Sequence, residues 1–152
     1  MANMTLDEFA DRVDEIMPQV TREFFRHETS EFYKMKVTLP QFVVMNILYT
    51  VGESKMTDIS RSAGVTTAAM TGLVDRLVKY AYVKRSSDPK DRRIVKIALT
   101  GEGSMTVKKM LDHRKKVVMK IFGLVSEAER DEYLRILTNI RDRLKENSLV
   151  RR

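Results

Sequence analysis

Residues 56–100 constrain the fold more than any other stretch, because they place two short helices and a β-hairpin in one order. The first helix is predicted at 58–63, with Thr57 as its N-cap. Gly64 follows as the turn residue, because a sharp bend after a helix favours a residue that tolerates positive φ. Thr66 then caps a second helix, whose apolar residues recur at spacings of three and four. Two helices joined by a short turn with glycine form a helix-turn-helix unit.

The second helix opens with small and hydroxylated side chains, which suit a helix end that must approach base edges and phosphates closely. A bulky aliphatic side chain there would hold the backbone away from a nucleic acid. Further along, Arg76 either reaches a phosphate or pairs with a carboxylate of its own subunit. Taken alone, this half of the segment also fits an ordinary pair of core helices. The candidate DNA contacts are Ser60 and Arg61 in the first helix and Thr66, Thr67, Ala69, Thr71 and Arg76 in the second.

Two short β-prone runs follow, at 82–86 and 94–99. The loop between them contains Asp88-Pro89, a turn signal, and carries Lys90, Arg92 and Arg93 at or beside its tip. A β-hairpin with a cationic tip behind a recognition helix is a wing, suited to reach across a phosphate backbone into a minor groove. The alternative is a solvated hairpin whose charges only keep the chain soluble.

Positive charge is concentrated in the same region. Residues 54–96 hold ten Lys or Arg against four Asp, so they contribute +6 to a net charge of +7. Such a concentration predicts a polyanionic partner. An acidic membrane would attract it too, but no basic amphipathic helix or lipidation motif supports a membrane partner.

Residues 36–104 resemble the winged helix of the MarR family (multiple antibiotic resistance regulators). The runs 73–77 and 39–42 are family-like, as is the Asp-Pro pair of the wing. The chain departs from the family at Gly72, where a longer and often polar side chain is usual, and at Ala81, which replaces a common glycine. The family signature is Asp-x-Arg, five residues, Leu-Thr, two residues and Gly, which the chain matches with Asp91, Arg93, Leu99, Thr100 and Gly103.

The resemblance implies that Arg93 enters the minor groove while Asp91 helps to orient it. A narrow minor groove attracts a guanidinium, and a neighbouring carboxylate can hold the guanidinium in place. Lys90 and Arg92 are expected to meet phosphates, with a solvated wing charge as the alternative for Arg92.

Helices are predicted before the helix-turn-helix. Residues 5–33 carry a strong apolar stripe, interrupted at Pro18, which should kink or break the helix near Asp14. Residues 39–51 form the next helix, which is largely apolar and has proline in its first turn.

Two more helices are predicted after the wing. Thr100 caps a long helix at 101–123, and Ser126 with Glu129 forms a capping box that starts the last helix. The predicted fold class is therefore mostly α with a small β-hairpin wing (α+β). It is a winged helix-turn-helix flanked by N- and C-terminal dimerisation helices.

The length suits one domain, residues 1–152, of MarR type. Residues 36–104 form its DNA-binding core, and residues 1–35 and 105–152 form a helical dimerisation region. The apolar stripes of the outer helices either pack in the chain's own core or pack with their copies across a two-fold axis. The family resemblance favours the homodimer, which would read a near-palindromic site with recognition helices about 34 Å apart.

We therefore expect a sequence-specific transcriptional regulator that binds double-stranded DNA, most often a homodimeric repressor in this family. The resemblance further implies release from DNA by a small, aromatic or phenolic effector bound between the dimer helices and the winged helix. The alternative is a winged-helix protein-interaction module without DNA binding, which Arg93 and the concentrated charge argue against. Candidate ligand residues, for which core packing is an equal explanation, are Tyr33, Phe42, Met45, Tyr49 and Met110.

Several other classes of site are not expected. The chain has no cysteine, which excludes disulfides, thiolate catalysis and zinc-thiolate sites. It has no phosphate loop or nucleophile elbow, so we expect neither an enzyme nor a cofactor. Glu23, His27 and Glu31 share one helical face, but such residues usually face solvent, and no metal is expected. Without a signal peptide or a long apolar run, the protein is expected to be cytoplasmic.

Overall fold

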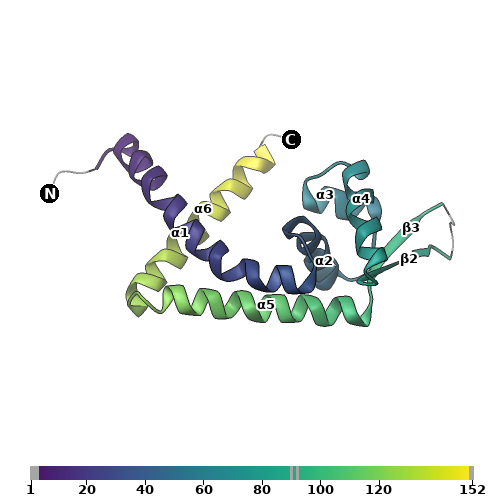
Figure 1. Ribbon diagram of the computed structural model, residues 1–152. Coiled ribbons are helices and arrows are strands. Elements are labelled where there is room, and N and C mark those ends of the chain that lie inside the picture. The colour runs from purple at the N-terminus through teal and green to yellow at the C-terminus, as the bar shows by residue number, and fades with distance from the viewer. Residues whose placement is uncertain (1–3, 90, 92, 151–152) are drawn as a thin grey trace. The chain divides into compact units, whose positions relative to one another are not determined.

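The computed structural model describes residues 4–89, 91 and 93–150, without the side chains of residues 25, 27–33 and 148–150. The chain divides into two compact units, residues 1–115 and 116–152. The predicted class, mostly helical with a small antiparallel sheet, is confirmed (Figure 1). In chain order the elements are α1 (Leu6–Met35), α2 (Leu39–Val51), β1 (Ser54–Lys55), α3 (Met56–Ala63), α4 (Thr67–Lys79), β2 (Val83–Ser87), β3 (Val95–Leu99), α5 (Gly101–Phe122) and α6 (Glu127–Val150).

The first unit is held together by a hydrophobic core among α2, α3, α4 and β3. α2 contacts α3 and α4, and α3 contacts α4, so the three helices support one another. β3 closes the core through Ile97, and α5 adds Val107 and Met110. The buried side chains of this core are Val37, Phe42, Val44, Met45, Leu48, Ile59, Met70, Val74, Leu77, Val83, Ile97, Val107 and Met110.

The helix-turn-helix forms as predicted, except at its start. α3 begins at Met56, and its N-cap is Lys55, whose side chain makes no capping bond. The prediction that Thr57 is the N-cap was wrong, because the pairing of β1 with β3 fixes the start of the helix. Gly64 adopts φ 68° and its N–H donates to Arg61 O at 3.2 Å. Thr66 Oγ1 accepts from the Ala69 N–H at 3.2 Å, so it caps α4 as predicted.

The wing belongs to a three-stranded antiparallel sheet in the order β1-β3-β2. β2 and β3 pair from Val83–Leu99 to Ser87–Val95, close to the strands predicted at 82–86 and 94–99. β1, which no sequence pattern predicted, pairs Ser54 with Ile97. Figure 1 shows the β2–β3 hairpin extending beyond α4. The base of the wing is therefore fixed on both sides of β3, while its tip projects.

α4, the wing and α5 meet at one junction. Thr100 Oγ1 donates to Ala81 O at 2.6 Å and accepts from the Gly103 N–H at 3.0 Å, so Thr100 caps α5 as predicted. A Cβ on Gly103 would collide with Tyr82 O, so only glycine lets α5 start this close to the wing. Ala81 adopts φ 58°, in the left-handed region, and its N–H donates to Val78 O as α4 ends. This is the helix-ending conformation that glycine favours.

α1 runs unbroken through Pro18, so the predicted alternative of a break near Asp14 is wrong. Its axis changes direction along its length instead, as a kink would require (Figure 1). The apolar stripe that predicted a buried face is largely uncovered. The exposed apolar side chains on α1 are Leu6, Phe9, Ile16, Met17 and Val20.

The second unit contains the end of α5 and all of α6. Its predicted capping box is present, because the Ser126 N–H donates to Glu129 Oε2 at 2.8 Å and the Glu129 N–H donates to Ser126 Oγ at 3.3 Å. Hydrogen bonds from the Ser126 hydroxyl and backbone N–H hold the pKa of the Glu129 carboxyl below its ordinary value. The rings of Phe122 and Tyr133 pack with their centroids 5.1 Å apart. α6 also exposes apolar side chains, namely Tyr133, Leu134, Ile136, Leu137, Ile140 and Leu144.

Candidate nucleic-acid interface

The recognition helix α4 separates its core residues from its candidate contact residues. Met70, Val74 and Leu77 are buried and fix the helix to the core. The candidates in the cap and first two turns are exposed, and small side chains let such a helix end enter a DNA groove. These exposed candidates are Thr66, Thr67, Ala69 and Thr71.

Two threonine hydroxyls of this helix end have partners within the chain. Thr66 Oγ1 serves as the helix cap, and Thr71 Oγ1 donates to Thr67 O at 2.9 Å. A hydroxyl oxygen keeps lone pairs when its hydrogen is donated. Thr71 therefore retains the capacity to accept a hydrogen bond from a base amino group.

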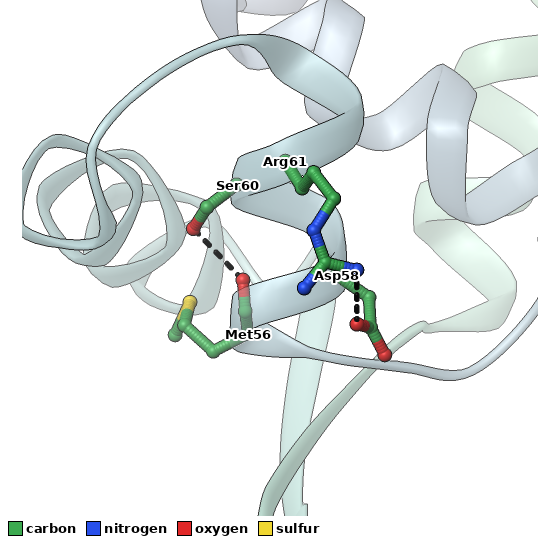
Figure 2. Close-up of polar contacts among 4 residues, drawn as sticks. All are labelled: Met56, Asp58, Ser60 and Arg61. Atoms are coloured by element: carbon green, nitrogen blue, oxygen red, sulfur yellow. Dashed lines mark hydrogen bonds and ion pairs between the residues drawn. The ribbon is translucent and has the colours of Figure 1, made fainter. Parts of the chain in front are cut away.

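Ser60 and Arg61 of α3 differ in what they offer to a partner, and Figure 2 shows them pointing to different sides of the helix. Ser60 is 4% exposed, and its Oγ donates to Met56 O at 2.8 Å. The predicted DNA contact by Ser60 thus has almost no surface available to it. Arg61 is exposed, and its guanidinium lies 3.5 Å from Asp58 Oδ1. Ion pairs of such exposure are weak, so Arg61 is available to a phosphate.

An ion pair connects the recognition helix to the wing. Asp75 Oδ1 of α4 lies 2.6 Å from a guanidinium nitrogen of Arg85 on β2. Arg85 was absent from the sequence-based candidates, although alternation along β2 places it on the same face as the buried Val83. Within the described part of the chain, Arg76 makes no ion pair, so of its two alternatives the geometry favours a phosphate.

The wing loop is fixed by carboxylates that bind backbone and amine groups. Asp91 Oδ1 accepts from the Arg93 backbone N–H at 3.0 Å, rather than from its guanidinium as expected. Asp91 therefore orients the backbone of Arg93 and leaves the exposed side chain to a partner. Asp88 lies 2.8 Å from Lys96 Nζ across the hairpin, and its hydrogen bond raises the pKa of that amine. The other two wing candidates, Lys90 and Arg92, lie outside the described residues.

A hollow of about 680 Å³ lies among α3, α4 and the wing. It brings Thr71 of α4, Arg85 of β2 and Arg93 of the wing to one concave surface. Lys55 and Thr57 also line it and were missed as candidates, because the short strand β1 that places them gave no sequence signal. The remaining lining residues are Met56, Ile94 and Val95.

Residues 37–95 match the sequence pattern of the MarR family. The uncharacterized HTH-type transcriptional regulator YfiV of Bacillus subtilis is 40% identical over 48% of this chain and 46% of its own length. The HTH-type transcriptional repressor MdtR of the same organism is 30% identical over 63% of this chain and 62% of its own length. Residues 37–95 therefore carry the MarR family pattern, and the relatives that match around them are named HTH-type transcriptional regulators.

Solved structures agree with this match at the level of the fold. A MarR family protein from Bacillus stearothermophilus matches with a TM-score of 0.79 and 18% identity, covering 93% of this chain and 99% of that one. A mutant of S. aureus MepR bound to an oligodeoxyribonucleotide matches with a TM-score of 0.65 and 19% identity, covering 86% and 96%. A MepR-like protein complexed with pseudoligands matches with a TM-score of 0.58 and 26% identity, covering 92% and 94%.

The MarR family relatives named here are transcriptional regulators rather than enzymes, and the chain carries the winged helix-turn-helix of the family. The matched segments span about half to two thirds of the length of the curated relatives, 46% to 64% for the first three.

The candidate effector residues fall into different environments. Phe42, Met45 and Met110 are buried in the core of the first unit, whereas Tyr49 is exposed. The side chain of Tyr33 lies outside the described residues. Three of the five thus belong to the same hydrophobic core.

The described ranges contain neither a cluster of metal-ligating side chains nor a helix able to span a membrane. Among those residues, no group of three or more His, Cys, Asp or Glu side chains is placed to hold a metal ion. The side chains of His27 and Glu31, from the weak metal alternative, are outside those ranges. The described helices include none with the length and apolar character needed to cross a membrane.

Proposed function

We propose that the chain is a homodimeric transcriptional repressor that binds a near-palindromic operator in double-stranded DNA and leaves it when a small effector binds. The observation that carries the proposal is the shared concave surface of Thr71, Arg85 and Arg93, which joins the recognition helix to the wing. A duplex offers these two elements a groove edge and a phosphate backbone at the same time.

The electrostatics of the winged helix support DNA as the partner. Residues 54–96 carry a net +6, and Arg76 and Arg93 make no ion pair within the described part of the chain. Cations without protein partners gain the most from phosphates, because binding releases condensed counterions from DNA.

Each contact residue has a distinct role in this proposal. Thr67, Ala69 and Thr71 lie against base edges in the major groove, and Thr66 holds the helix end that carries them. Arg61 and Arg76 meet phosphates, as do Lys90 and Arg92 of the wing. Arg93 enters the minor groove from a backbone that Asp91 fixes. Ser60, already bonded to Met56, supports α3 and does not contact DNA directly.

The exposed apolar faces of α1 and α6 support a homodimer. Among the described side chains, five large apolar ones of α1 and six of α6 are exposed in the single chain, from Leu6 to Leu144. Exposed apolar surface of this extent is typical of protein–protein interfaces. A two-fold dimer would place two recognition helices about 34 Å apart, one helical turn of DNA.

The proposed repression and effector response follow the relatives. MdtR of Bacillus subtilis and NicR of Pseudomonas putida are named repressors. An effector changes DNA affinity only by its preference for one spacing of the recognition helices. Because Phe42, Met45 and Met110 are buried in the core, an effector that reaches them has to separate core side chains, whereas Tyr49 is exposed.

The test is fluorescence anisotropy with a duplex from upstream of the chain's own gene, titrated at several salt concentrations. Arg93→Ala is compared with the unmodified chain and with Lys84→Ala. Lys84 is a matched control, because it lies on the neighbouring strand and alternation places it on the face opposite Arg85. We expect Arg93→Ala to weaken binding about ten-fold and reduce sequence selectivity, while Lys84→Ala lowers affinity less and equally for all duplexes.

Equally weak binding by all three proteins to every duplex, without dependence on salt, would contradict DNA binding. Capture of a stable protein partner under the same conditions would then favour the protein-interaction module instead.

A further inference from the structure

Gly72 lies in the middle of the recognition helix, where neither a close contact nor a positive φ requires glycine. A Cβ built at this position meets nothing within 4 Å, and the backbone is not in the left-handed region. Glycine destabilises a helix interior relative to alanine, because it loses more backbone freedom on folding. The residue therefore weakens α4 and gains nothing from the packing of its own chain.

Other glycines of the chain are required by a positive φ or by a close contact. Gly64 needs its positive φ, and a Cβ on Gly103 would strike the Tyr82 carbonyl. Gly101 has open space like Gly72, but it is the first residue of α5, where the helix is not yet fully formed. Among the six glycines, Gly72 alone combines open space with a position inside a helix.

Gly72 lies on the side of α4 that faces away from the core. Met70 and Val74 are fully buried, and each is two residues from Gly72. Two residues correspond to about 200° around an α-helix, so Gly72 lies nearly opposite the buried face. It follows Thr71, which lines the hollow shared with Arg93. Gly72 thus lies on the face of α4 turned away from the core, beside the face on which Thr71 lines the hollow.

We propose that Gly72 is a specificity-determining position of the DNA interface, at which a base edge in the major groove approaches the helix backbone. This inference rests on the proposed function. Close approach of backbone to a ligand is one of the few needs that only glycine meets. A methyl group at the same place would occupy the space of the base edge and hold this turn of α4 away from the groove floor.

The experiment begins by selecting duplexes from a random library with the unmodified chain, and then measures binding by anisotropy. Gly72→Ala should raise the melting temperature by about 2–4 °C, because alanine is the better helix former. It should weaken binding to the selected duplex about ten-fold, as one lost base contact does. Its affinity for a scrambled duplex of the same composition should change less than about two-fold, because phosphate contacts are kept.

Gly101→Ala is the matched control, since it adds the same methyl group in open space outside the recognition helix. It should leave binding to both duplexes unchanged. A repeated selection with Gly72→Ala should return a sequence altered at one base pair of each half-site. Higher stability with undiminished binding, or the same selected sequence, would overturn the inference. If the unmodified chain selects no sequence, the proposed function itself fails, which is a distinguishable result.

Discussion

Leu77 in α4 is fully buried, whereas Leu137 in α6 is 43% exposed and Leu144 is 64% exposed. The winged helix buries a core of apolar side chains within the same chain, whereas every large apolar side chain described on α6 is exposed. Both regions carry apolar residues at helical spacing, so the pattern alone does not distinguish them. The winged helix is thus stabilised by contacts within one chain, whereas the apolar stripes of the outer helices gain little from such contacts.

The largest expected effect comes from the core of the winged helix. Leu77→Ala removes a fully buried side chain and leaves a cavity, so the free energy of unfolding should fall by about 2–5 kcal/mol. Urea denaturation monitored by circular dichroism measures the change. Val78→Ala, at a residue 38% exposed on the same helix, is the control and should cost less than about 1 kcal/mol. A similar loss in both variants would mean that α4 is not anchored through its inner face.

The outer helices should respond through association instead. Leu137→Glu places a charge on the exposed apolar face of α6, and a charge buried without a partner at an interface is costly. The dimer dissociation constant should rise about 100-fold, as sedimentation equilibrium would measure. Asn139→Glu, which lies about 200° around the helix, is the matched control and should leave association unchanged. A Leu137→Glu variant that associates as tightly as the unmodified chain would show that α6 is not an interface.

A small gain in stability is expected from relieving the strained backbone of Ala81 at the end of α4. Ala81→Gly should raise the free energy of unfolding by about 0.5 kcal/mol, because it relieves the left-handed conformation but adds freedom to the unfolded chain. The gain should be independent of protein concentration, since the junction lies within one chain. Ala98→Gly in β3 should destabilise instead, which separates relief at φ 58° from a general effect of glycine.

The smallest change in stability is expected from protonation of the Glu129 carboxylate at the start of α6. Ser126 hydrogen bonds lower the pKa of Glu129 below 4.5, so the carboxylate stabilises the helix above that pH and the contribution is lost as pH falls through the folded pKa. Carbon-13 NMR titration should show Ser126→Ala raising the pKa of Glu129. Ser104→Ala, in α5, should not change it. An unshifted Glu129 in the unmodified chain would exclude the capping box in solution.

Local chemistry was enough to predict most of the fold. Thr66 and Ser126 were predicted as caps because a Ser or Thr hydroxyl just before a helix can accept a hydrogen bond from a free backbone N–H of its first turn. β1 was missed because two residues carry no periodicity, and they form a strand only where β3 returns from a distant part of the chain. The error at Thr57 has the same cause, since β1 sets where α3 begins.

The candidate site shows the same division between local and non-local information. Spacing placed Asp91 beside Arg93, but only the backbone geometry reveals that the carboxylate holds the Arg93 N–H. Ser60 was predicted to contact DNA from its place in the first helix of the helix-turn-helix, whereas its bond to Met56 O satisfies the hydroxyl inside the protein. The partnership of Asp75 with Arg85 depends on how the wing packs against α4, which no sequence spacing encodes.

The junction around Thr100 has a mechanical consequence. Thr100 is hydrogen-bonded to both Ala81 and Gly103, and Gly103 lies against the Tyr82 carbonyl. These contacts connect the base of the wing directly to the first turn of α5. Only Thr100 separates the end of β3 from the start of α5, so the wing and the helix are joined without a loop. A tilt of the first turn of α5 would therefore either displace the base of the wing or break these hydrogen bonds.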